Sequence, residues 1–140
     1  WKEGPDNLWA LDDTNYIVWE CKNEVKTTRL EINKREAEQM NRSCAWFQKH
    51  YPGLKAKKIM IHPSKTVGSA AAFTHDVEVM SVRGLKGFVS TVKAFFKSFE
   101  TVDFKNLSAK YIQGLLNSHK LNVDDFLNNY TKKPKDSKSK

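Results

Sequence analysis

The chain has 140 residues and carries 24 Lys and Arg against 16 Asp and Glu, a formal net charge of +8. This length suits one domain with a real hydrophobic core, and no stretch approaches the roughly 20 apolar residues of a membrane-spanning helix. The two cysteines, Cys21 and Cys44, exclude a disulfide framework and lack the spacing of zinc ligands, so we expect small buried thiols in a reducing, cytoplasmic setting.

The first predicted elements are two short strands joined by a turn. Residues 7–11 and 16–22 are rich in aromatic and aliphatic residues, and the Asp-Asp-Thr-Asn stretch at 12–15 favours a turn because its side chains bond nearby backbone. We predict an antiparallel hairpin in which the numbers of paired residues sum to roughly 27. Asp6 then lies opposite a point close to Cys21, at the open end of the hairpin.

The second strand ends in Glu20-Cys21-Lys22, and this ending holds the candidate chemistry. Side chains two apart on a strand share a face, so Glu20 and Lys22 lie side by side while Cys21 points the other way. Placing a carboxylate and an ammonium at the end of an apolar strand costs free energy of desolvation unless the two are paired or serve a function. The simplest alternative to a functional site is an ion pair at the sheet rim. With Asp6 nearby, two carboxylates and a lysine meet, a set that suits Mg²⁺ or Mn²⁺ beside a phosphodiester.

A helix and two further strands follow the hairpin. Thr28 and Glu31 have capping-box spacing and predict a helix over residues 30–49. Its expected core stripe is Leu30, Ala37, Met40, Cys44 and Phe47. Residues 57–62 and 77–82 predict the third and fourth strands. His62 ends the third strand, where a structural role is the favoured interpretation. Ser64 and Lys65 follow it and, by position alone, are candidates to touch phosphate.

The rest of the chain is predicted to be helical. The clearest amphipathic helix has a core stripe of Leu85, Phe88, Val89, Val92, Phe95, Phe96 and Phe99. Ser108 and Asn122 predict the caps of two more helices, which could pack on the sheet edge, cover a partner surface or guide a substrate. Residues 132–140 hold five lysines and one aspartate, a net +4 that leaves +4 for the rest, and we expect a basic, disordered tail.

Pro5-Asp6 followed by Glu20-Cys21-Lys22 on a hairpin, with a helix and a strand after it, resembles the PD-(D/E)xK nuclease superfamily. The resemblance covers residues 4–62. It implies an α/β, restriction-endonuclease-like fold: a mixed sheet of about four strands flanked by helices, with extra C-terminal helices. The corresponding divisions are a nuclease-like core at 1–100, a helical extension at 101–131 and the tail at 132–140.

The resemblance also assigns roles to single residues. Asp6, Glu20 and the backbone carbonyl of Cys21 would hold Mg²⁺, with Mn²⁺ as a substitute, and Lys22 would be the catalytic lysine. The helix after the motif strand often places a Gln or Glu near the metal, which suggests Gln39 as a further site residue. Some relatives that act on DNA ends have a Tyr four residues after this Gln, whereas Ser43 stands there in this chain. An ordinary exposed helix residue is the alternative for Gln39 and for its neighbour Glu36.

The expected function is that of a metal-dependent deoxyribonuclease domain, with DNA as its partner and no membrane contact. Relatives often belong to larger helicase- or translocase-containing chains. The family's first helix is missing here or lies before Trp1, and we expect upstream domains of the same chain. Many relatives cut as homodimers, which stays open here. Two other functions stay open: a catalytically inactive nucleic-acid-binding or docking module, and a hydrolase acting on RNA or nucleotides.

Overall fold

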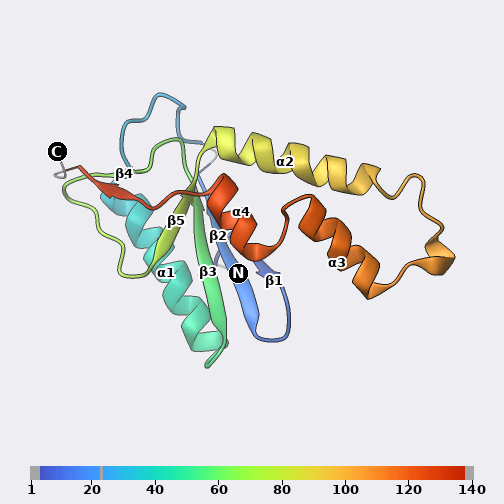
Figure 1. The fold of residues 1–140 in the computed structure, drawn as a ribbon. Coiled ribbons are helices and arrows are strands. Elements are labelled where there is room, and N and C mark those ends of the chain that lie inside the picture. Colours follow the sequence, from blue (N-terminus) through green and yellow to red (C-terminus); the bar gives the residue numbers. More distant parts are fainter. Residues whose placement is uncertain (1–3, 23, 138–140) are drawn as a thin grey trace.

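The computed structural model describes residues 4–22 and 24–137 and centres on a four-stranded mixed sheet in the order β1-β2-β3-β5 (Figure 1). Strand β1 (Asn7–Ala10) runs antiparallel to β2 (Asn15–Cys21), whereas β3 (Lys55–Ile61) and β5 (Val77–Met80) run parallel to β2. Helices cover both faces. The predicted α/β class with a mixed sheet of about four strands flanked by helices is therefore confirmed.

The hairpin forms as the turn chemistry predicts. Asn7 pairs with Trp19 and Ala10 with Tyr16, so paired numbers sum to 26, one less than expected. Asp12 closes the turn, because its carboxylate accepts hydrogen bonds from the backbone N–H groups of Thr14 and Asn15, both at 2.8 Å. Asp6 consequently lies at the open end, level with the end of β2.

The three parallel strands end at one edge of the sheet, which we call the carboxyl edge. Cys21 pairs with Ile61, which pairs in turn with Met80. The ladder continues one step further, since Lys22 N–H donates to the Ile61 carbonyl at 3.0 Å and His62 N–H donates to the Met80 carbonyl at 3.0 Å. The residues that follow the strands thus emerge side by side at this edge, where helices α1 and α2 begin.

Helix α1 (Lys34–His50) covers one face and begins later than predicted. Its N-terminal cap is Asn33, whose side chain accepts from the Glu36 N–H while the Glu36 side chain accepts from the Asn33 N–H. The expected cap at Thr28 is therefore wrong: the same spacing recurs five residues on, where Ile32 is fully buried and anchors the helix start. Leu30, assigned to the core stripe, is 85% exposed.

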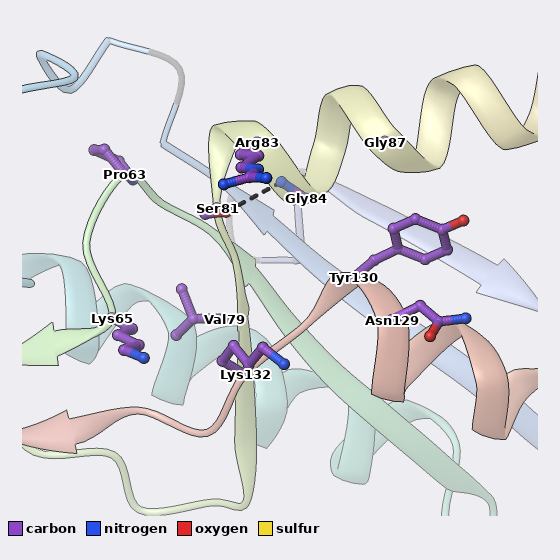
Figure 2. Close-up of a pocket in the computed structure, with 10 residues that line it drawn as sticks. All are labelled: Pro63, Lys65, Val79, Ser81, Arg83, Gly84, Gly87, Asn129, Tyr130 and Lys132. Carbon is purple, nitrogen blue, oxygen red and sulfur yellow. Dashed lines mark hydrogen bonds between the residues drawn. The ribbon is translucent and has the colours of Figure 1, made fainter.

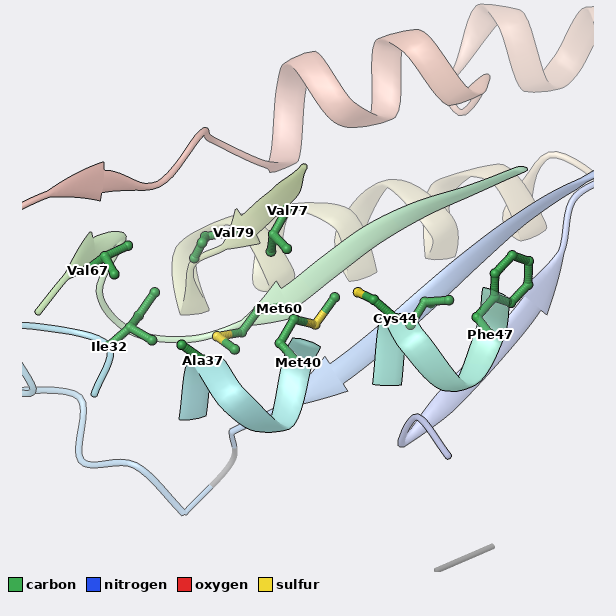
Figure 3. Close-up of a cluster of buried hydrophobic side chains, with 10 residues drawn as sticks. Ile32, Ala37, Met40, Cys44, Phe47, Met60, Val67, Val77 and Val79 are labelled. Carbon is green, nitrogen blue, oxygen red and sulfur yellow. The ribbon is translucent and has the colours of Figure 1, made fainter. Parts of the chain in front are cut away.

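The core beneath α1 joins the helix to β2, β3 and β5 (Figure 3). Val18, Met60, Val77 and Val79 project from the strands, and the other four predicted stripe residues of α1 meet them. These helix residues are Ala37, Met40, Cys44 and Phe47.

Helices α2 (Val82–Lys97) and α4 (Val123–Tyr130) cover the opposite face. Phe126 of α4 is buried and packs edge-on against Trp19, with ring centroids 6.0 Å apart. Within the predicted extension at residues 101–131, α4 therefore contributes to the sheet's second core. The predicted α2 stripe is only partly buried: Phe95 is 9% exposed, whereas Phe96 is 64% exposed.

The C-terminal elements also include η1 (Phe104–Asn106) and α3 (Ala109–Ser118). Ser108 caps α3 and Asn122 caps α4, as predicted. Among the described residues, none of the helices combines the length and apolar character needed to cross a membrane.

The basic C-terminal segment is ordered where the structure describes it. Lys132 bridges to Val79, and β6 (Lys135–Asp136) pairs with β4 (Thr66–Val67). The expectation of disorder is wrong up to residue 137, because backbone pairing with the core, which composition does not reveal, holds this segment in place. Residues 138–140 lie outside the described part.

Candidate functional site

Glu20 is the centre of the candidate site and is fully buried, with 0% of its surface exposed. Its carboxylate points toward α1 and lies on the same face of β2 as Lys22, the face that strand alternation predicts the two to share. Lys22 Nζ lies 2.6 Å from Oε1, and the Ser43 hydroxyl donates to Oε2 at 2.8 Å. Burial raises the pKa of Glu20 above its ordinary value of 4.5, against the opposing effects of the Lys22 and Ser43 hydrogen bonds. The ion pair is thus internal rather than a solvated pair at the rim.

Asp6 reaches the same strand end from the hairpin. Its Oδ2 accepts a hydrogen bond of 2.7 Å from the backbone N–H of Cys21. The negative charge of Asp6 also raises the pKa of Glu20, as its smallest contributing cause. Asp6, Glu20 and Lys22 are therefore brought to one place, as the hairpin pairing predicts.

A pocket of about 370 Å³ opens beside these residues. Its walls include Asp6, Cys21 and Lys22 from the hairpin and Glu36 and Gln39 from α1. Gln39 is half-buried there, so the structure brings it to the pocket rather than to the outer face of the helix. Lys22 lines the pocket, and its ammonium contacts the buried Glu20 carboxylate.

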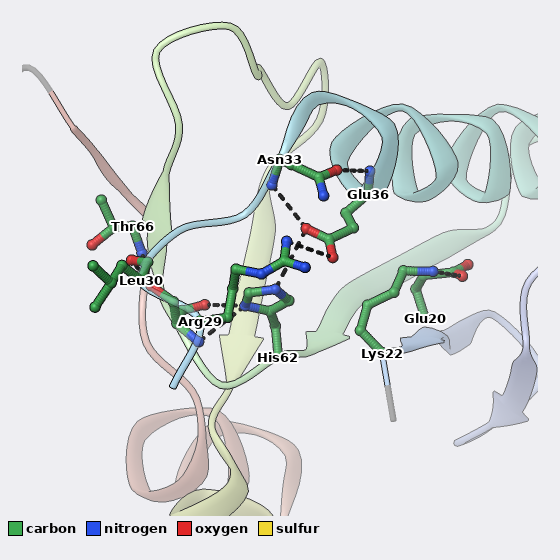
Figure 4. Close-up of polar contacts among 9 residues, drawn as sticks. Glu20, Lys22, Arg29, Leu30, Asn33, Glu36, His62 and Thr66 are labelled. Atoms are coloured by element: carbon green, nitrogen blue, oxygen red, sulfur yellow. Dashed lines mark hydrogen bonds and ion pairs between the residues drawn. The ribbon is translucent and has the colours of Figure 1, made fainter. Parts of the chain in front are cut away.

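A second polar cluster, formed by Arg29, Glu36 and His62, adjoins this pocket (Figure 4). Glu36 lies 3.5 Å from both Arg29 Nη1 and His62 Nε2. His62 is fully buried; its Nδ1 lies 2.9 Å from the Ser64 backbone nitrogen and 2.8 Å from the Ser64 carbonyl oxygen, and its Nε2 faces Glu36. His62 is thus a packed histidine, and Glu36 is a buried capping carboxylate rather than an exposed helix residue.

Two contributors were missed from the sequence, for different reasons. The Asn33-x-x-Glu36 spacing contains the signal for the buried Glu36, but the earlier Thr28-x-x-Glu31 was preferred. Ser43 had no signal as a partner of Glu20, since the two are 23 residues apart. Only the packing of α1 on β2 brings its hydroxyl to the carboxylate.

The cysteines do not supply a reactive thiolate. Burial raises the pKa of Cys44 to about 12, and burial together with the nearby Asp6 and Glu20 raises that of Cys21. Both thiols are therefore protonated at neutral pH, which agrees with the prediction of small core side chains for Cys44; Cys21 is only half-buried.

The oxygen donors at this site fit a hard divalent cation such as Mg²⁺ in kind, since Asp6 and Glu20 supply two carboxylates. In the described part of the chain, no cluster of three or more His, Cys, Asp or Glu side chains is arranged to hold a metal. Both Glu20 oxygens already have a hydrogen-bond partner within the protein, Lys22 at Oε1 and Ser43 at Oε2.

Comparison of this chain with protein-family models, with curated proteins and with solved structures gives no match.

Replacing Glu20 by Gln should flatten the dependence of stability on pH. A raised pKa means that the folded state binds more protons than the unfolded state from about pH 4.5 up to the folded pKa, so the free energy of unfolding falls as pH rises through that window. Gln does not titrate and removes this slope. Urea unfolding from pH 4 to pH 8 measures it, and Glu38→Gln on exposed α1 surface gives the effect of the charge change alone. Parallel curves for wild type and Glu20→Gln would contradict the prediction.

Proposed function

We propose that this chain is a metal-dependent nuclease domain that hydrolyses DNA phosphodiesters on a restriction-endonuclease-like fold. The observation that carries the proposal is the Glu20–Lys22 pair, buried at the end of β2 with Asp6 alongside. Burying an ion pair rarely adds stability over apolar packing, whereas a carboxylate and an ammonium paired beside a pocket suit phosphoryl chemistry.

Each residue has a distinct task in this proposal. Asp6 and Glu20, with the Cys21 carbonyl, supply oxygen ligands, and Ser43 fixes the Glu20 carboxylate so that Oε1 faces Lys22. Lys22 leaves Oε1 for the scissile phosphate and stabilises its developing negative charge. Gln39 lines the pocket and orients water or phosphate by hydrogen bonding. When bound, Mg²⁺, or Mn²⁺ in its place, supplies a Lewis acid that polarises the phosphate and lowers the pKa of the attacking water.

The element order supports the proposed fold. A hairpin carrying the acidic motif precedes a helix and then a strand parallel to the motif strand, the order that the PD-(D/E)xK resemblance implies. We infer from the same resemblance an intracellular setting, with upstream domains of a DNA-processing chain as partners.

The second candidate is a catalytically inactive DNA-binding module on the same fold. It is favoured by the close Lys22–Glu20 contact, which satisfies the carboxylate without a metal. Direct Mn²⁺ binding separates the two: the nuclease proposal expects saturable binding, and the inactive module expects none.

The substitution Asp6→Asn should weaken Mn²⁺ binding by at least about tenfold and reduce DNA cleavage in parallel. Asn removes the charge but can still accept from the Cys21 N–H, so the hairpin should be retained. Mn²⁺ binding is read by electron paramagnetic resonance, and cleavage by the loss of supercoiled plasmid with Mg²⁺ or with EDTA.

Asp13→Asn is the matched control, because it makes the same charge change on the exposed turn. It should bind Mn²⁺ and cleave as wild type does. A wild-type chain that binds no Mn²⁺, or an Asp6→Asn variant that binds it equally well, would overturn the metal assignment.

A further inference from the structure

A second opening lies at the carboxyl edge, on the face of the sheet opposite α1. It is a cleft of about 560 Å³ between the start of α2, the end of α4 and the segments around Lys65 and Lys132 (Figure 2). Three cationic side chains line it, Lys65, Arg83 and Lys132, and its ten lining residues include no Asp or Glu. We call this opening the basic cleft.

The three cations of the basic cleft are free to meet an anion. No ion pair involves any of them within residues 4–22 and 24–137. Backbone hydrogen bonds nevertheless fix two of these residues in place: Lys132 pairs with Val79, and the Lys65 carbonyl accepts from Lys135 N–H at 2.9 Å. Charges held on fixed backbone without partners repel one another, and a bound anion would relieve that repulsion.

The adjacent Lys133 shows the contrast. Its ammonium lies 2.5 Å from Asp76 and 2.9 Å from Glu78, so its charge is used within the protein. Successive side chains of an extended segment alternate in direction, which sends Lys133 to the acids and Lys132 to the cleft. Arg83 adds to the argument, since a cation in the first turn of α2, which has no acidic residue, opposes the helix dipole unless an anion is near.

The basic cleft and the candidate site share one edge of the sheet. The candidate site lies at the end of β2, and the cleft lies at the ends of β3 and β5. Two inter-strand spacings, about 10 Å, separate β2 from β5 within the sheet. The two openings lie on opposite faces, with residues of α1 in the wall of one and residues of α2 and α4 in the wall of the other.

We propose that the basic cleft binds the sugar–phosphate backbone of the DNA whose phosphodiester is presented to the Glu20–Lys22 site. The inference rests on the proposed function for the choice of DNA as ligand. A concave wall with cations on facing sides suits a strand that enters it, whereas a membrane surface is flat. The contacts are to phosphate alone, so binding should be independent of base sequence.

The test replaces all three cations with Gln in the full chain, as Lys65→Gln, Arg83→Gln and Lys132→Gln together. All three residues are exposed, and the backbone pairing does not depend on their side chains. Lys49→Gln, Lys55→Gln and Lys57→Gln together form the control: they remove the same charge from exposed positions on the opposite end of the sheet and of α1. Both triple variants lower the net charge from +8 to +5.

Fluorescence anisotropy with a labelled DNA duplex, in EDTA to exclude cleavage, measures affinity over a range of salt. The cleft variant should bind at least about tenfold more weakly at low salt, and the slope of log affinity against log salt should fall by about 2 to 3. The control should keep the wild-type slope. Equal losses in both variants, or no loss in the cleft variant, would overturn the proposal.

Binding of the same variants to two other polyanions, anionic phospholipid vesicles and poly-glutamate, tests whether the cleft prefers a ligand other than DNA. If the cleft substitutions weaken binding to either one and leave DNA binding intact, the cleft belongs to a membrane or to an acidic protein and the proposal is wrong. The binding assay contains EDTA and does not depend on cleavage. A chain that binds DNA through the cleft but does not cleave it in a separate assay with Mg²⁺ therefore refutes the nuclease proposal and leaves the cleft proposal standing.

Discussion

Replacing Lys22 by Met should reduce the rate of DNA cleavage by about 100-fold to 1000-fold, the usual effect of losing one group that stabilises charge in the transition state. Lys22 is the cation that adjoins Glu20 at the pocket, and its ammonium already contacts the carboxylate at 2.6 Å. Met keeps the aliphatic length and removes only the charge. The loss should fall on kcat, with KM little changed, because the DNA backbone is held elsewhere. Plasmid cleavage with saturating Mg²⁺ measures it.

Two companion variants make that result specific. Lys55→Met makes the same exchange at an exposed position at the start of β3 and should cleave as wild type does. Lys22→Met also leaves the buried Glu20 without its cation, which costs stability, so Lys22→Met with Glu20→Gln tests the fold: the double variant should recover stability and remain inactive. Wild-type cleavage by folded Lys22→Met would remove Lys22 from the chemistry.

The part of the site that the sequence predicts is the part built from local pairing. A turn at Asp12 to Asn15 fixes the hairpin register to within one residue, and strand alternation then fixes which way Glu20 and Lys22 point. Asp6 follows from the same counting. These placements need no information about the rest of the chain, so the sequence alone predicts them.

The parts that could not be predicted depend on contacts between distant segments. The Ser43 hydrogen bond to Glu20 exists only because α1 lies across β2, and composition gives no sign that Lys132 pairs with Val79. The helix start was misplaced because two capping boxes compete, and burial of Ile32 decides between them. Local signals offer candidates in such cases, and tertiary packing selects among them.

The same distinction applies to the C-terminal helices. Their caps were predicted correctly at Ser108 and Asn122, but a cap says where a helix begins and not what it covers. In the structure, α4 fits tightly against α2. A Cβ atom on Gly84 would lie 2.5 Å from the Tyr130 carbonyl oxygen, so glycine is needed for this close approach.

Replacing Phe126 by Ala should therefore destabilise the whole domain, by about 3 to 5 kcal/mol, as expected for a buried aromatic ring in a core. Phe126 is 4% exposed, and its ring packs edge-on against Trp19 of β2 and Phe88 of α2, with centroids 6.0 and 4.9 Å away. Urea unfolding followed by tryptophan fluorescence measures the loss, since Trp19 lies on the sheet itself.

Phe104→Ala is the matched control, because that ring is 68% exposed and its removal should change the free energy of unfolding by no more than about 0.5 kcal/mol. If α4 were an appendage, Phe126→Ala would leave the unfolding midpoint of the sheet unchanged. A single transition at lower urea would instead mean that the face bearing Trp19 depends on α4. Since β2 carries Trp19 on that face and Glu20 on the other, the candidate site would then share its stability with a helix more than 100 residues further along the chain.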